Sequence, residues 1–228
     1  MKRTKNPAKE AEYRKRAADL VAQMTLHEKV SQMLSWAPAI ERLGIPAYNW
    51  WSEGIHGVGR AGTATVFPQA IGMAAAFDED MMEQVGNAIG VEARGKYNMC
   101  RAHGDRDIFK GLTVWAPNIN IFRDPRWGRG HETYGEDPFL TSRLGVRFVE
   151  GMQGDDPDYL QAAACAKHFA VHSGPESDRH HFNAIVSKQD LWETYLPAFR
   201  ALVKEAGVEA VMGAYNRTNG EPCCGSKT

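Results

Sequence analysis

The sequence lacks any apolar run of about 18 residues, the length that a helix needs to cross a bilayer. It also lacks an excess of one charge, since 27 lysines and arginines stand against 28 aspartates and glutamates. We therefore expect neither nucleic acid nor an anionic membrane as a partner. The amino end is basic but no apolar segment follows it, which is unlike a secretory signal and predicts a cytoplasmic protein.

Cysteine is scarce, with only four thiols spread over 228 residues. Four scattered cysteines are too few for a disulfide framework. The sequence contains no CxxC pair, so it does not indicate a structural zinc site. Aromatic residues, in contrast, are plentiful: six Trp, seven Tyr and nine Phe supply the apolar surface that a disordered chain lacks. The sequence therefore predicts a folded chain, long enough for one large domain or two small ones.

Predicted helices alternate with short apolar strands. Segment 8–22 is typical of a charged helix, and Thr25 with Glu28 forms a capping box before the next helix. Pro68 fits the first turn of another helix. Apolar strands are predicted at 112–121, 162–170 and 209–216, and helices after Asp78 or Asp80, after Asp137 and after Ser187.

This order of elements indicates an α/β fold with a parallel sheet. In such folds the loops that follow the carboxyl ends of the strands carry the chemistry, and the long polar loops here do follow the strands. We count about four or five strand–helix units, whereas a closed barrel needs eight over roughly 250 residues. The sequence therefore predicts a sheet that is incomplete at its C-terminal end.

Gly57, Gly59 and Gly62 match the dinucleotide pattern GxGxxG. That pattern requires an apolar strand before it and a helix that opens on it. Here the polar segment NWWSEGIH precedes the glycines, and Pro68 delays any helix. The sequence gives no support for a nucleotide cofactor.

The segment Trp50, Trp51, Ser52, Glu53 places a carboxylate beside two indole rings. Aromatic faces pack against the C–H face of a sugar ring, and carboxylates accept paired hydrogen bonds from neighbouring hydroxyls. The same pattern also fits two core tryptophans and a solvated glutamate. This segment alone leaves both interpretations open.

Charged residues are dense in the Gly- and Pro-rich loop 123–137. Such charges usually form ion pairs that hold a loop rigid, and an arginine held in this way can direct its donors at a ligand. Lys167 and His168 follow the run AAACA at the predicted end of a strand. Packing explains this pair poorly, because lysine is almost never buried without a partner.

His172, His180 and His181 come next, so a metal-dependent hydrolase is an alternative. Neither HxH nor HExxH occurs, and we therefore expect no metal and no other cofactor. Spacing alone does not identify a pair of catalytic carboxylates. The conceivable candidates are Glu53, Asp124, Glu132, Glu136 and Asp178.

Five segments in succession resemble glycoside hydrolase family 3, nearest to its bacterial β-xylosidase and β-glucosidase branch. They read NWWSEGIHGV, TVFPQAIGMAAAFD, WAPNINIFRDPRWGRGHETYGEDP, CAKHFAVHSGP and MGAYNRTNGEPCCGSK. The resemblance implies that residues 1–228 are the N-terminal part of a partial (β/α)8 TIM-like barrel, with a charged helix in 1–24. The family's second, sandwich domain is expected to be absent.

The resemblance further implies a retaining, exo-acting β-glycosidase that removes terminal xylose or glucose from oligosaccharides or aryl β-glycosides. One carboxylate attacks the anomeric carbon and a second protonates the leaving oxygen. The nucleophilic Asp of the family is expected beyond Thr228, so we expect no catalytic residue in this chain and no activity from the chain alone.

The sugar-binding half of the site can be matched residue by residue. Glu53 matches a carboxylate that holds sugar hydroxyls, Arg129 a hydroxyl-binding arginine, and Lys167 with His168 a pair of hydrogen-bond donors. Arg179 and Tyr215 are weaker matches. Ser52 stands where the family commonly has asparagine, which leaves xylose and glucose undecided.

Two rival functions stay open besides the enzyme fragment. A non-catalytic carbohydrate-binding module would need the same sugar-binding residues and no nucleophile. A metal-dependent barrel hydrolase would need the histidines between His168 and His181. An open barrel edge would also leave strands unpaired, so we expect self-association through that edge.

Overall fold

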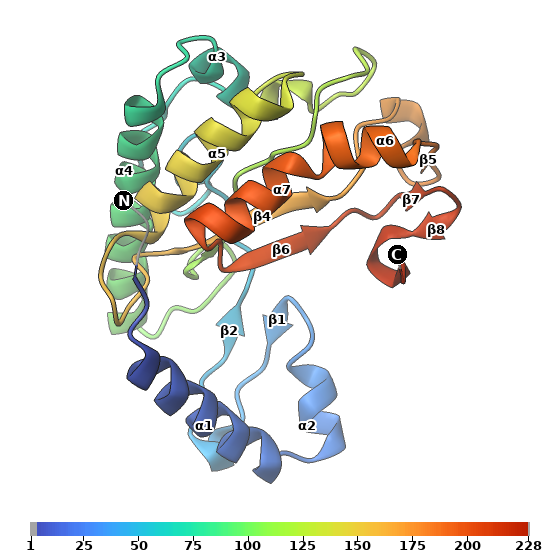
Figure 1. The fold of residues 1–228 in the computed structure, drawn as a ribbon. Helices are drawn as coiled ribbons and strands as arrows, with labels where there is room; N and C mark the ends of the chain where they lie inside the picture. The colour runs from blue at the N-terminus through green and yellow to red at the C-terminus, as the bar shows by residue number, and fades with distance from the viewer. Residues whose placement is uncertain (1–3, 228) are drawn as a thin grey trace.

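The computed structural model describes residues 4–227, so Met1–Arg3 of the expected helix over 1–24 and Thr228 lie outside the described residues. A parallel sheet with outer helices forms the larger part, and an amino-terminal segment extends from it (Figure 1). That segment contains α1 (Pro7–Gln23), α2 (Leu26–Ser31), β1 (Trp36–Ala37) and β2 (Tyr48–Asn49). The predicted capping box is confirmed, since Thr25 and Glu28 exchange hydrogen bonds at the start of α2.

The central sheet is parallel, in the order β3-β4-β6. Its strands are β3 (Thr113–Val114), β4 (Ala163–Phe169) and β6 (Ala210–Gly213). Val114 pairs with Ala164, and Cys165 pairs with Ala210. Ser52, just after β2, adds a parallel bridge to Val114 and so continues the sheet on its other side. The predicted α/β fold with parallel strands is confirmed.

The first predicted strand is much shorter than expected. Residues 112–121 were expected to be extended, but the ladder with β4 covers only Thr113 and Val114. Pro117 has no N–H with which to continue the ladder. Beyond it the chain keeps a single bridge between Asn118 and Lys167, and Ile119 N–H donates to the Lys167 carbonyl at 2.9 Å.

Two long helices cover the outside of the sheet. They are α4 (Glu79–Ala102) and α5 (Pro138–Gln153), capped by Asp78 and Asp137 as predicted. The backbones of the two helices touch directly: a Cβ on Gly151 would lie 2.0 Å from the Glu83 carbonyl oxygen. A Cβ on Gly86 would lie 2.3 Å from the Phe148 carbonyl oxygen, so larger residues would separate the helices.

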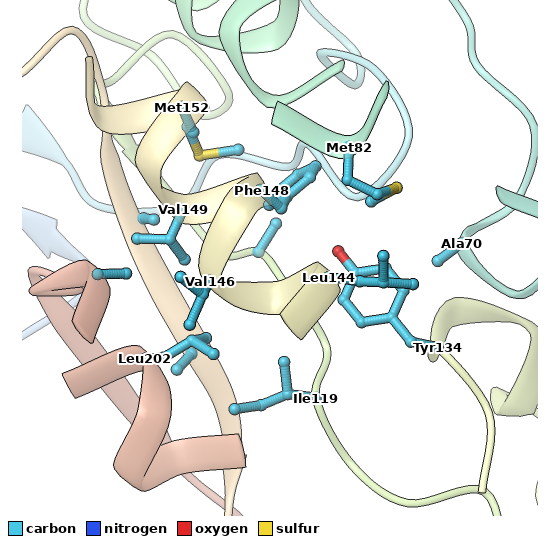
Figure 2. Packing of buried hydrophobic residues seen from close by; sticks show 14 of the residues in the cluster. Ala70, Met82, Ile119, Tyr134, Leu144, Val146, Phe148, Val149, Met152 and Leu202 are labelled. Carbon is cyan, nitrogen blue, oxygen red and sulfur yellow. The ribbon is translucent and has the colours of Figure 1, made fainter. Parts of the chain in front are cut away.

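The hydrophobic core lies between these helices and the sheet. Figure 2 shows α5, which carries Leu144, Phe148 and Met152, lying between Met82 of α4 on one side and Leu202 on the other. Ala164 and Ala166 on β4, with Ala162 just before it, complete this cluster from the sheet side. Because strand residues alternate in direction, Cys165 and Lys167 face the opposite side of the sheet.

The helix predicted after Ser187 is present but interrupted. It consists of α6 (Lys188–Asp190), a π-helical turn at Leu191–Tyr195, α7 (Pro197–Ala201) and a second π-helical turn at Leu202–Ala206. Pro197 cannot donate a helical hydrogen bond, and Leu196 N–H donates to the Leu191 carbonyl five residues back. Gly207 ends the helix in the left-handed conformation.

The other short elements connect these layers. They are α3 (Ala70–Ala74), β5 (Asn183–Ala184), β7 (Arg217–Thr218) and β8 (Glu221–Pro222). Pro68 was wrongly placed in a first helical turn, because α3 begins after Gln69. All four cysteines are free thiols. Within residues 4–227 we find no helix long and apolar enough to cross a membrane.

Candidate functional site

The six candidate residues come from segments that follow neighbouring strands. Glu53 follows the Ser52 bridge to β3, Arg129 lies in the loop between β3 and α5, and Lys167 with His168 lies near the end of β4. Arg179 lies in the loop after β4, and Tyr215 follows β6. Since the carboxyl ends of parallel strands share one edge of a sheet, the fold brings all of these segments to the same edge.

Glu53 and Lys167 form the first contact in the site. The Lys167 Nζ lies 4.0 Å from the Glu53 Oε2, and the exposed fractions of the two side chains are 4% and 34%. Burial lowers the pKa of Lys167 from its ordinary value, and the Glu53 carboxylate opposes this shift. The protein therefore holds a buried cation at the floor of the site with a partly open carboxylate beside it.

Two stacked indoles stand next to Glu53. Trp51 Nε1 donates to the Glu53 Oε1 at 2.8 Å, and the Trp51 ring stacks on Trp115 with 4.9 Å between centroids. Trp50 and Trp51 are both exposed, so the interpretation of these residues as a buried core is wrong. An indole held by a carboxylate and left open on one side can pack against an apolar ligand face.

Arg129 is fixed by a two-point ion pair. Its Nε donates to the Glu132 Oε1 at 2.7 Å and its Nη2 to the Glu132 Oε2 at 2.6 Å. The third nitrogen, Nη1, lies 3.5 Å from the His168 Nε2. Asp124 and Arg126 form a separate pair in the same loop, so most of its charges do bind each other.

Arg179 and Tyr215 lie against a second histidine. Arg179 Nε donates to the Tyr215 hydroxyl. The Tyr215 ring lies 5.3 Å from the His172 ring, which in turn lies 4.8 Å from the His168 ring. The contacts therefore run without a break from Arg129 through the two histidines to Tyr215.

Asn120 and Asn216 were not predicted from the sequence, and His172 was considered only as a metal ligand. Asn120 holds His168, and Asn216 Oδ1 lies 3.2 Å from the His172 Nδ1. All three side chains are buried. A signal was available in the run WAPNINIF, where two asparagines alternate with isoleucines in an apolar segment, because a buried amide must find hydrogen-bond partners.

His168 and His172 are neutral in this environment. Burial, followed by the nearby His172 and Lys167, lowers the pKa of His168. Burial also lowers the pKa of His172 from 6.5 to about 4, although its contact with Asn216 acts in the opposite direction. Neutral imidazoles are available as hydrogen-bonding groups rather than as cations.

The buried His172 predicts acid-sensitive folding. The unfolded chain binds a proton on this histidine near pH 6.5 and the folded chain near pH 4, so stability falls as the pH drops through that interval. The difference between the two pKa values corresponds to about 3 kcal/mol. We expect His172→Gln to lose less unfolding free energy than the wild type over this interval in denaturant titrations. The control is His27→Gln, at an exposed site on α2, whose unfolding free energy should decrease with falling pH as in the wild type. An equally steep decrease in His172→Gln would contradict the prediction.

The geometry does not favour the metal-dependent alternative. Within the part of the chain that the structure describes, no group of three or more His, Cys, Asp or Glu side chains could hold a metal ion. The Gly57–Gly62 segment is followed by a loop up to α3, so the helix required for a dinucleotide site is not there.

The candidate carboxylates fall into different environments. Asp124 and Glu132 bind arginines, and Glu136 and Asp178 are exposed. Glu53 contacts the buried lysine. The site thus combines a carboxylate, a guanidinium, an ammonium and an imidazole, a set that can donate to and accept from several neighbouring hydroxyls.

Comparison with known proteins gives a consistent result. Residues 16–228 match the glycosyl hydrolase family 3 N-terminal domain. A xylan 1,4-beta-xylosidase from Xylanibacter ruminicola is 52% identical over 217 residues, which cover 93% of this chain and 25% of that protein. Beta-D-xylosidase 3 of Arabidopsis thaliana is 44% identical, over 92% of this chain and 28% of that protein. The chain spans about a quarter of the length of these curated relatives.

Solved structures show the same similarity. An exo-beta-xylosidase, XlnD, in complex with a xylobiose aziridine activity-based probe superposes with a TM-score of 0.82 at 36% identity, over 92% of this chain and 28% of that one. The beta-glucosidase DesR from Streptomyces venezuelae, in complex with D-glucose, gives 0.75 at 35% identity, over 92% and 26%. The family's N-terminal domain is a TIM-like α/β barrel, and the parallel strands and outer helices described above are part of such a barrel. This chain belongs to glycosyl hydrolase family 3.

Proposed function

We propose that this chain is the N-terminal part of a retaining β-glycosidase that removes terminal β-linked xylose or glucose from oligosaccharides or aryl β-glycosides. Its residues 1–228 would form part of the barrel domain and supply side chains that bind sugar hydroxyls. The two catalytic carboxylates would come from polypeptide that the relatives have and this sequence does not include. The names of the relatives and the chain's share of their length support this division.

One observation carries the proposal: the buried Lys167 lies beside Glu53, next to the Arg129–His168 contact. Glu53 would accept hydrogen bonds from hydroxyls, while Lys167 and Arg129 would donate to them, and the Trp51 ring would pack against the sugar's C–H face. Hydrogen bonds to ring hydroxyls that strengthen in the oxocarbenium-like transition state lower the barrier. Arg179 and Tyr215 would close the other end of the site.

The test is hydrolysis of aryl β-xylosides and β-glucosides by the intact gene product, with the anomeric configuration of the first product followed by NMR. We expect hydrolysis with retention, and no hydrolysis by residues 1–228 expressed alone. Sugar binding in calorimetry without hydrolysis of either substrate would favour a carbohydrate-binding module. Hydrolysis by the isolated chain would contradict the proposed division of the site.

A further inference from the structure

Asn120 has a defined orientation in the structure. Its Nδ2 lies 2.9 Å from the His168 carbonyl oxygen and 3.3 Å from the Ala170 carbonyl oxygen, and both of these atoms can only accept. Its Oδ1 lies 2.9 Å from the His168 backbone N–H, which can only donate. Three backbone contacts therefore fix which end of the amide is oxygen.

This orientation determines where His168 carries its proton. The Asn120 Oδ1 also lies 2.9 Å from the His168 Nδ1. An amide oxygen only accepts hydrogen bonds, so the Nδ1 must be the protonated nitrogen. A neutral imidazole has one proton, and its other nitrogen, Nε2, then has a lone pair that can accept a hydrogen bond.

The surroundings of His168 keep a second proton away. The groups that face it are Arg129 from the loop before α5, Lys167 on β4, and His172 and Arg179 from the loop after β4. These groups are cations or bases, and no carboxylate contacts the ring in the described residues. The Arg129 Nη1, a donor, is directed at the Nε2 from 3.5 Å.

We propose that Asn120 is a positioning residue that holds His168 in the Nδ1–H tautomer, so that Nε2 accepts a hydrogen bond from the same sugar hydroxyl to which Arg129 donates. This differs from the donor role expected for His168 from the family resemblance. The sugar part of this inference rests on the proposed function, whereas the tautomer does not. A hydroxyl that replaced the direct contact between Arg129 and His168 would use both its acceptor and its donor, and a group that only accepts would not fit.

The first experiment is ¹⁵N NMR of the intact gene product with labelled histidine and no sugar, with His168 assigned from the signal lost in His168→Asn. We expect the Nδ1–H tautomer at neutral pH, and a shift toward a tautomer mixture in Asn120→Ala. An Nε2–H tautomer in the wild type, or an unchanged tautomer in Asn120→Ala, would overturn the proposal whether or not the protein hydrolyses glycosides.

The second experiment uses Asn120→Asp, which keeps the shape of the side chain. A carboxylate on the Nδ1 favours the doubly protonated imidazole, which has no acceptor left. We expect inhibition by the product sugar to weaken by about 10-fold more on acidification than in the wild type, the upper end of the range for one hydrogen bond between uncharged groups. Asn219→Asp, an exposed asparagine that accepts only from the Val186 N–H, adds the same charge away from histidine and should follow the wild type.

The outcomes distinguish the acceptor role of His168 from the proposed glycosidase function. An Asn120→Asp profile identical to that of Asn219→Asp would overturn the acceptor role of His168. A wild type that neither hydrolyses glycosides nor binds the sugar would refute the proposed function alone, because the NMR experiment still determines the tautomer that Asn120 imposes.

Discussion

We expect Lys167→Met to lower kcat/KM of the intact gene product for its best aryl β-glycoside by about 10²–10³-fold, as the loss of one directed donor does in other active sites. Methionine has a similar length but no charge and no donor, so the Lys167 contact with Glu53 would disappear. Steady-state kinetics on the two aryl substrates measures this effect.

The same change should leave the fold intact. Burial lowers the pKa of Lys167, which means that the protein disfavours its charged form, and Glu53 stays partly solvated when the lysine is gone. Removing one partner of an ion pair is strongly destabilising when the other charge is left buried and unpaired, and the partly exposed Glu53 is not buried in that way. In the wild type, the lowered pKa of Lys167 makes the unfolding free energy rise with pH up to about 10.5, because the unfolded chain binds the proton more strongly. This rise should be absent in Lys167→Met. Lys5→Met, which removes an exposed pair with Glu209, serves as the control for charge. An unchanged kcat/KM in Lys167→Met would contradict the sugar-binding role.

Arg129→Lys should have a comparable effect although the charge is kept. The guanidinium uses two nitrogens for Glu132 and directs the third at His168, and a single ammonium cannot make both contacts. We expect kcat/KM to fall by about 10²-fold or more, with little change in the midpoint of thermal unfolding. The measurement combines kinetics with a melting curve for each variant.

A matched control lies three residues away in the same loop. Arg126 makes the same kind of two-point pair with Asp124, through its Nε at 3.0 Å and its Nη2 at 2.8 Å, but its side chain is exposed. Arg126→Lys should therefore keep wild-type kinetics. Equal losses in the two variants would mean that the loop, rather than the directed Arg129 nitrogen, is responsible.

Local signals predicted much of the fold. Thr25, Asp78 and Asp137 begin helices as their side chains indicate, because each accepts a backbone N–H of the first turn. The errors came from prolines whose effect depends on context. Pro117 ends a strand that its apolar neighbours predicted would continue. Pro197 lies inside a helix that accommodates it by a π-helical turn.

The site was predicted less completely than the fold. Lys167 stands out because burying a lysine requires a partner, whereas the roles expected for Glu53 and Arg129 came from the family resemblance. Asn120 did not stand out, because nothing in a sequence says which histidine a buried amide will meet 48 positions later. Such pairings depend on the register between β3 and β4, which the hydrophobic pattern does not specify.

The glycines between α4 and α5 have a mechanical consequence. Helices separated by side chains can slide past each other as rotamers adjust, but Gly86 and Gly151 bring main-chain atoms of the two helices into direct contact. The pair should therefore move as one stiff unit. Because α5 also packs against the sheet that carries Lys167, a displacement of the outer layer would be transmitted to the strand ends instead of being absorbed.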